Sequence, residues 1–298
     1  MVNSRLQTSD PLIYAAGDCV ETNHLISGKR AQAPFGSLAN RQGRVVADNL
    51  AGIPSLFPGV VNTFIMKAFD ISIGATGMSL ETALADGFDA IQVITAQSDR
   101  AHFFPTQAII PLAMVVDRRT RKVLGVQGFG PMNDAVLARL DAAAGLLARG
   151  ATVEEFSNLE MAYAPPFSTA LDALNATANV ADNALAGRLR TVSVEAFLAW
   201  MESPELHPDW RALDIRHPNE AQAFTAAFAE RWQAVPYVEV RRRAAEITCD
   251  QTLIIICDAG TRSYETQCFL DSLGKSNTLV LGGGFNLVRR MAVSWWPK

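Results

Sequence analysis

Residues 253–263 read LIIICDAGTRS, and this stretch decides how the carboxy-terminal third of the chain is interpreted. The apolar run at 253–256 has the length and composition of a buried strand, and a helix is expected to begin near Ser263. Cys257 stands where the strand ends. A thiol in that position faces the crevice in which α/β proteins bind ligands, so we interpret Cys257 as a reactive residue. The alternative is a small apolar residue that ends a buried strand.

The loop at 257–262, CDAGTR, has the features of an anion-binding turn. Its backbone N–H groups and the dipole of the next helix favour negative charge near the thiol. Gly260 lets the backbone curl without a Cβ clash, and Arg262 adds a fork of cationic donors. We predict that Cys257 and Arg262 are catalytic. The residues expected to line the loop are Asp258, Ala259, Gly260, Thr261 and Ser263.

The composition is that of a folded protein without a nucleic-acid or membrane partner. The chain has 298 residues, 49% hydrophobic and 19% charged, a net charge of -4 and a pI near 5.6. This length usually exceeds one core, so two domains are expected. No apolar run approaches the roughly 20 residues that span a bilayer, which favours a cytoplasmic protein. Four cysteines without zinc spacing predict reduced thiols and no metal site.

The first half predicts an α+β arrangement. A strand is expected at 12–15 before a tight turn at Gly17, then a helix at 37–50. Strand patterns follow within 61–77, at 90–98 and in a hairpin at 108–130. Helix caps are expected at Ser79, at Asp134 and in a capping box formed by Thr152 and Glu155.

After residue 186 strands and helices alternate. Strands are expected at 210–215, 252–257 and 278–284, and helices from 193, at 220–232, at 238–247 and from 263. Apolar strands between helices are typical of a parallel sheet covered on both faces.

Three motifs in this part resemble the rhodanese family over about residues 189–297. The pattern Cys257-x-x-Gly260-x-Arg262-Ser263 resembles the active loop of that family, and 281–284, LGGG, its last strand and turn. The segment ALDIR at 212–216 resembles the Asp-x-Arg strand end of that family. This resemblance implies that Asp214 and Arg216 support the site, either as a structural ion pair or by shaping the entrance of the pocket. The family's Gly-His-Ile segment is missing from 226–237.

The first half resembles the pyridine nucleotide-disulfide oxidoreductases over residues 10–185. The segment LIYAAGDC at 12–19 resembles their second flavin-binding motif, which implies flavin contacts for Gly17 and Asp18. Residues 161–183 resemble the end of the dimerisation domain in the coenzyme A-disulfide reductase branch, where fused rhodanese domains occur. The same resemblance implies that Tyr163 is a possible contact for a substrate bound to the partner subunit.

These resemblances divide the chain into three expected parts. Residues 1–58 are expected to be a remnant of a flavin-binding domain. Residues 59–185 are expected to form an α+β dimerisation domain with an antiparallel sheet, and 186–298 an α/β rhodanese-like domain with a central parallel sheet. No Gly-x-Gly-x-x-Gly motif follows a strand, so the chain is expected to be a shortened form without its flavin reductase half.

The resulting expectation is a rhodanese-like sulfurtransferase that carries sulfur as a Cys257 persulfide. The expected partners are a small donor, thiosulfate or a persulfide, a thiol acceptor, and a second copy in a homodimer. No cofactor is expected in this chain, whereas FAD is implied for full-length relatives. The alternative is a non-catalytic sulfur-carrier, dimerisation or docking module.

Overall fold

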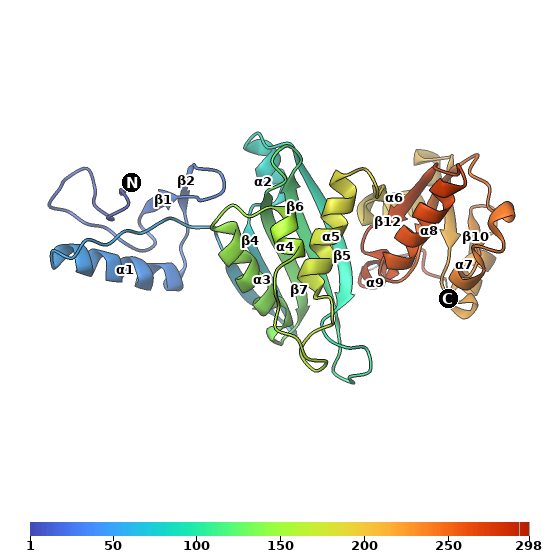
Figure 1. The fold of residues 1–298 in the computed structure, drawn as a ribbon, viewed down its shortest axis with the longest axis horizontal. Coiled ribbons are helices and arrows are strands. Elements are labelled where there is room, and N and C mark those ends of the chain that lie inside the picture. Colours follow the sequence, from blue (N-terminus) through green and yellow to red (C-terminus); the bar gives the residue numbers. More distant parts are fainter. Residues whose placement is uncertain (292, 298) are drawn as a thin grey trace. The chain divides into compact units, whose positions relative to one another are not determined.

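The structure is a computed structural model that describes residues 1–291 and 293–297. The chain divides into two units: Met1–Gln92 with Met114–Leu159, and Val93–Ala113 with Glu160–Lys298. Each has its own buried apolar side chains. Figure 1 shows both units and labels many of their helices and strands.

The first unit begins with a small antiparallel ribbon and a long helix. The ribbon pairs β1 (Glu21–Asn23) with β2 (Arg30–Gln32), and α1 (Gly36–Leu50) follows. Leu38 of α1 packs in a cluster with Leu6, Phe57 and Val60. The expected helix at 37–50 is therefore confirmed.

A five-stranded sheet has the order β3-β4-β7-β6-β5, and the pairs β3/β4 and β4/β7 are antiparallel. Its strands are β3 (Phe64–Ala68), β4 (Ile71–Gly77), β5 (Ala90–Ser98), β6 (Ile109–Asp117) and β7 (Val123–Pro131). The helices of this region are α2 (Leu80–Ala85), α3 (Asp134–Leu147) and α4 (Val153–Ser157).

Local capping signals set two of these helix starts as expected. The Ser79 side chain accepts the N–H of Thr82, and Thr152 forms the capping box with Glu155. The expected cap at Asp134 is wrong by one residue, because the Asn133 side chain accepts the backbone N–H of Ala135 at 3.0 Å.

The second unit contains a parallel sheet in the order β10-β9-β11-β12-β8. Its strands are β8 (Thr191–Val192), β9 (Trp210–Asp214), β10 (Trp232–Ala234), β11 (Thr252–Ile256) and β12 (Thr278–Leu281). The helices are α5 (Ala173–Leu185), α6 (Val194–Glu202), α7 (Pro218–Ala227), α8 (Thr261–Ser272) and α9 (Gly284–Val288). Short 3-10 turns are η1 (Pro204–Leu206), η2 (Tyr237–Glu239) and η3 (Ala244–Glu246).

The predicted combination of an antiparallel sheet and a parallel sheet is thus present, and the fold is mixed α/β. Several local expectations are wrong, and the strand expected at 278–284 ends at Leu281 because Gly284 begins α9. Residues 12–15 form no extended strand, because Tyr14 makes only an isolated bridge to Gln7. The helix expected at 220–232 ends at Ala227, because Trp232 joins β10. The helix expected at 238–247 is two 3-10 turns, because buried Val240 and Ile247 are held against the sheet.

The parallel sheet has an aromatic core on one side and an aliphatic core on the other. Phe197, Trp232 and Phe285 are buried together, with ring centroids 6.1 to 6.4 Å apart. Leu213, Ile255 and Cys257 belong to the second cluster. Across residues 1–291 and 293–297, no helix combines the length and apolar character needed to cross a bilayer.

Candidate functional site

Cys257 lies directly after β11 and is almost fully buried, with 1% of its surface exposed. The backbone N–H of Gly260 donates to its Sγ at 3.1 Å. Gly260 has φ +94° and is the N-cap of α8, so the loop reaches the helix through a left-handed turn that glycine favours. The expected thiol loop before a helix amino terminus is therefore present.

The start of α9 holds this loop from the other side. The N–H of Phe285 donates to the Cys257 carbonyl, and the N–H of Asn286 to the Asp258 carbonyl, both at 2.9 Å. Gly284 has φ +58°, and a Cβ at this position would lie 2.4 Å from the Asp258 oxygen. Only glycine allows the two backbones to approach this closely.

A chain of ion pairs borders the loop. Arg262 donates to Asp258 at 2.5 Å, and Arg289 donates to the other oxygen of Asp258 at 2.9 Å. Arg289 also pairs with Glu220 of α7 at 2.8 Å. Arg262 thus lies beside the thiol loop with its charge partly balanced by Asp258.

The first turn of α8 contains a buried hydroxyl without a partner. Ser263 is 1% exposed, and its Oγ makes no hydrogen bond to any described residue. Buried hydroxyls are almost always paired, so an unpaired one in the first turn of α8 calls for a specific explanation. Thr261 is the first residue of the same helix.

Asp214 and Arg216 form a fully buried bidentate pair. Arg216 donates to the two Asp214 oxygens at 2.9 and 2.6 Å, and Trp232 Nε1 adds a third bond at 3.2 Å. The guanidinium carbon lies 3.9 Å from the centroid of the Phe285 ring. Because Phe285 also binds the Cys257 carbonyl, this pair supports the loop through the core.

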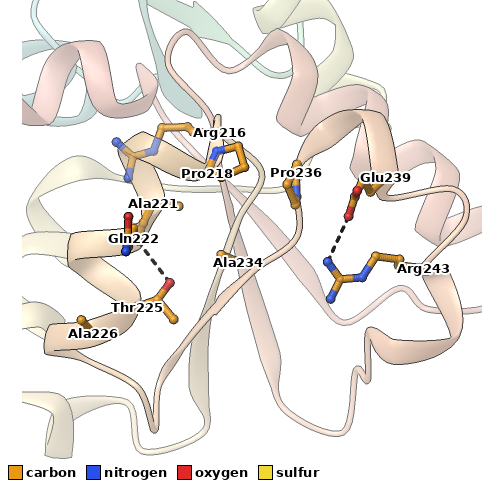
Figure 2. A pocket seen from close by; sticks show the side chains of 10 residues that line it. All are labelled: Arg216, Pro218, Ala221, Gln222, Thr225, Ala226, Ala234, Pro236, Glu239 and Arg243. Carbon is orange, nitrogen blue, oxygen red and sulfur yellow. Dashed lines mark hydrogen bonds and ion pairs between the residues drawn. The ribbon is translucent and has the colours of Figure 1, made fainter.

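Figure 2 shows a cavity of about 580 Å³ between α7 and the segment around Pro236. Its lining residues are Arg216, Pro218, Ala221, Gln222, Thr225, Ala226, Ala234, Pro236, Glu239 and Arg243. Glu239 and Arg243 pair with each other at 3.1 Å on the side opposite α7. Cys257 is not among the lining residues.

Tyr237 packs against the cluster that contains Cys257. Its hydroxyl donates to Glu265 Oε2 at 2.5 Å, and this bond raises the pKa of Tyr237. Burial and the Glu265 charge act in the same direction, whereas Arg241 and Arg262 oppose them. Tyr237 therefore stays a protonated phenol at neutral pH.

The other predicted site residues lie away from this loop in the sequence. Gly17 has φ +85°, and its N–H donates to the buried Gln42 side chain at 2.7 Å. Asp18 is exposed. Tyr163 is 55% exposed in the segment between α4 and α5. No group of three metal-ligating side chains occurs in residues 1–291 and 293–297.

Residues 63–174 match the dimerisation domain of the pyridine nucleotide-disulphide oxidoreductases. The chain therefore contains this domain, which supports a homodimer. It is 39% identical over 178 residues to an NAD(P)H coenzyme A polysulfide/persulfide reductase of Pyrococcus horikoshii, over 60% of this chain and 39% of that protein. The chain thus spans less than half the length of this curated relative.

Two solved structures resemble nearly the whole chain. An NAD-dependent persulfide reductase from A. fulgidus superposes with a TM-score of 0.85 at 36% identity, over 95% of this chain and 49% of that one. Reduced Bacillus anthracis CoADR-RHD superposes with a TM-score of 0.84 at 29% identity, over 96% and 50%. The homologues are coenzyme A-disulfide and persulfide reductases.

These findings correct the expected activity. The relatives are NAD(P)H persulfide reductases, coenzyme A disulfide reductases and an NADH oxidase, which are oxidoreductases rather than rhodaneses. The expectation of a rhodanese-like sulfurtransferase acting through a Cys257 persulfide is therefore wrong. The expectation relied on three short motifs within residues 189–297, whereas the likeness to reductases extends over most of the chain.

Residues that support the loop from a distance were not found from the sequence. Gln97 donates to the Ala259 carbonyl, and Asn286 donates to the Ala96 carbonyl. Each pair is separated by more than 150 residues, and the surrounding sequence gives no local signal of the contact.

Proposed function

We propose that this chain is the carboxy-terminal part of a flavin-dependent NAD(P)H oxidoreductase that reduces persulfides or coenzyme A disulfides. The likeness to the A. fulgidus persulfide reductase over 95% of the chain is the observation that carries this proposal. The match of the dimerisation domain and the Pyrococcus relative support it independently.

The three expected parts take defined roles in this proposal. Residues 1–58 belong to the flavin-binding domain, 59–185 form the dimerisation domain, and 186–298 are a rhodanese-like module that serves the reductase. The parallel sheet with a thiol loop at the end of β11 supports the last assignment. The likeness to Bacillus anthracis CoADR-RHD over 96% of the chain supports this order of the three parts.

FAD, when bound, would relay a hydride equivalent from NAD(P)H to a disulfide or persulfide. Within this chain, the exposed Asp18 carboxylate is free to accept a hydrogen bond from a flavin hydroxyl, and the turn at Gly17 allows close approach. Gly17 and Asp18 are the residues of this chain that would contact the cofactor.

The thiol loop is assigned as an accessory site for the sulfur-bearing end of the substrate. The Gly260 N–H, the unpaired Ser263 hydroxyl and the Arg262 cation are the groups that support an anionic ligand there. Asp258, Ala259 and Thr261 shape the loop, and Asp214 with Arg216 supports it. The exposed Tyr163 hydroxyl is available to a substrate of the partner subunit.

A chimera tests the proposal. It would join this chain to the half of the A. fulgidus enzyme that the chain does not match. The proposal expects a purified yellow homodimer that oxidises NADH when coenzyme A persulfide or coenzyme A disulfide is added. Flavin absorbance, light scattering and NADH absorbance are the three readouts.

Two variants of the chimera refine the test. Asp18→Ala is expected to lower flavin retention, whereas Cys257→Ser is expected to leave flavin retention unchanged and to raise the KM for the persulfide. A folded, flavin-loaded chimera that oxidises NADH equally with and without the sulfur substrates would contradict the proposal.

A further inference from the structure

The peptide unit between Ala259 and Gly260 is held at both of its ends. Its N–H, from Gly260, donates to Cys257 Sγ at 3.1 Å. Its carbonyl, from Ala259, accepts a hydrogen bond from the Gln97 side-chain amide at 3.4 Å. In a planar trans peptide the C=O and N–H point in opposite directions, so a bond that fixes the oxygen also fixes where the N–H points.

This peptide would turn easily without such a bond. Gly260 has no side chain, and a Cβ placed on it would meet nothing within 4 Å. Glycine in open space can change φ and ψ at little cost, and the N–H could then leave the sulfur. The contact made by Gln97 opposes this rotation.

Gln97 belongs to β5, at the end of the strand order of the five-stranded sheet. Its neighbour Ala96 accepts the Asn286 side-chain amide at 3.3 Å, and the Asn286 N–H binds the Asp258 carbonyl at 2.9 Å. Of these two consecutive residues of β5, Gln97 contacts the thiol loop directly and Ala96 reaches it through Asn286. An edge strand has unpaired backbone groups that can accept such bonds.

We propose that Gln97 is a positioning residue for Cys257: through the Ala259–Gly260 peptide it directs an N–H at the sulfur and so stabilises the thiolate. Hydrogen bonds in series polarise one another, so the bond to the Ala259 oxygen also strengthens the N–H donor at the other end. The reactivity of the thiol is thereby linked to β5. This role goes beyond the proposed reductase activity, because it concerns the chemistry of Cys257 itself.

The test is the pH profile of Cys257 alkylation in Gln97→Met. Methionine has a similar shape but lacks the N–H donor. Native protein is treated with iodoacetamide from pH 5 to 10, and the peptide containing Cys257 is quantified by mass spectrometry. The midpoint of the profile is expected to move upward by about half a pH unit, and the rate at pH 7 to fall about three-fold, as for the loss of one weak hydrogen bond. The rate at the alkaline plateau is expected to stay the same.

Gln127→Met is the matched control. Gln127 is also a half-buried glutamine on a strand, β7, and its amide donates to the Met78 carbonyl at 3.1 Å without touching the thiol loop. An unchanged midpoint in Gln97→Met, or an equal change in Gln127→Met, would overturn the proposal. Alkylation of Cys257 only after unfolding would overturn it as well. The assay needs neither flavin nor NAD(P)H, so its outcome is independent of the proposed function.

Discussion

Residues 12–19 and 253–263 look alike in the sequence but differ in structure. Each has an apolar run followed by a glycine-containing turn with a candidate functional side chain, Asp18 in one and Cys257 in the other. Leu12 is 87% exposed, and the run around it makes one isolated bridge. Leu253 is 3% exposed, in a strand that pairs with both β9 and β12.

The difference teaches that a motif becomes a structured site only where the chain also supplies its neighbours. The turn at Gly17 is held by Gln42, whereas the Cys257 loop is held by Phe285, Asn286 and Gln97. A strand of a sheet has no stable position without partner strands. The A. fulgidus persulfide reductase is about twice as long as this chain, which covers 49% of it.

The largest effect is expected for Arg216→Met, which breaks the support beneath the thiol loop. The variant leaves the buried Asp214 carboxylate without its counter-charge, with only the Trp232 Nε1 and residue 216 backbone N–H bonds left to it, which costs about 3–5 kcal/mol of unfolding free energy. Urea unfolding followed by tryptophan fluorescence measures this loss, because every tryptophan lies after residue 199. Arg242→Met is the control, because the Arg242 side chain is 75% exposed and its ion pair is worth less than about 1 kcal/mol. Equal losses in the two variants would contradict the structural role of the buried pair.

A matched leucine pair tests the comparison of the two segments directly. Leu253→Ala is expected to cost about 2–5 kcal/mol, because it leaves a cavity in the parallel-sheet core. Leu12→Ala is expected to change stability by less than about 0.5 kcal/mol, because the side chain is exposed. Urea unfolding followed by far-ultraviolet circular dichroism covers both units. A large loss in Leu12→Ala would show that residues 12–15 already pack in this chain.

Gly284→Ala tests how tightly α9 is held against the loop. The new Cβ would lie 2.4 Å from the backbone carbonyl oxygen of Asp258, and φ at this position is positive. We therefore expect the unfolding free energy to fall by about 2–3 kcal/mol. Gly187→Ala separates the two causes, because Gly187 also has positive φ but open space around its Cβ position. A loss of about 1 kcal/mol is expected there. Similar losses in the two variants would mean that the close approach adds nothing.

A small effect of pH is expected from His24 of the first unit, which is buried and bonded to Ser27 at 3.0 Å. Burial lowers the pKa of His24 from 6.5, and the Asp86 charge opposes part of this. The unfolded chain then takes up a proton that the folded chain resists, so stability is complete above about pH 6.5 and falls as the pH drops below it. Between pH 7.5 and 5.5, the unfolding free energy of His24→Gln is expected to fall less than that of the wild type, by a difference of under about 1 kcal/mol. An identical pH dependence in the variant and the wild type would contradict this assignment.

Local signals in the sequence predicted the parts of the fold that depend on neighbouring residues. The cap at Ser79 and the capping box at Thr152 need only residues within one helical turn. The loop after β11 was likewise predicted from adjacent residues. The parallel sheet followed from the alternation of strands and helices.

The parts that were missed depend on distant contacts. Residues 238–247 have a helical pattern, but Ile247 is drawn into the core beside Leu253, and the segment forms two 3-10 turns. The contact between Gln97 and Ala259 spans 162 positions, so no spacing in the sequence could reveal it. The reductase assignment rests on the dimerisation domain and whole-chain likeness rather than on the loop motif.

The most direct test is the yield of sulfide per NADH oxidised by the chimera supplied with coenzyme A persulfide under nitrogen. Reduction of a persulfide, RSSH + NADH + H⁺ → RSH + H₂S + NAD⁺, requires equimolar sulfide and NAD⁺. The proposed function predicts this ratio and its dependence on added persulfide. NADH oxidation that proceeds only when dioxygen is admitted, without sulfide release, would contradict the assignment to sulfur-compound reduction.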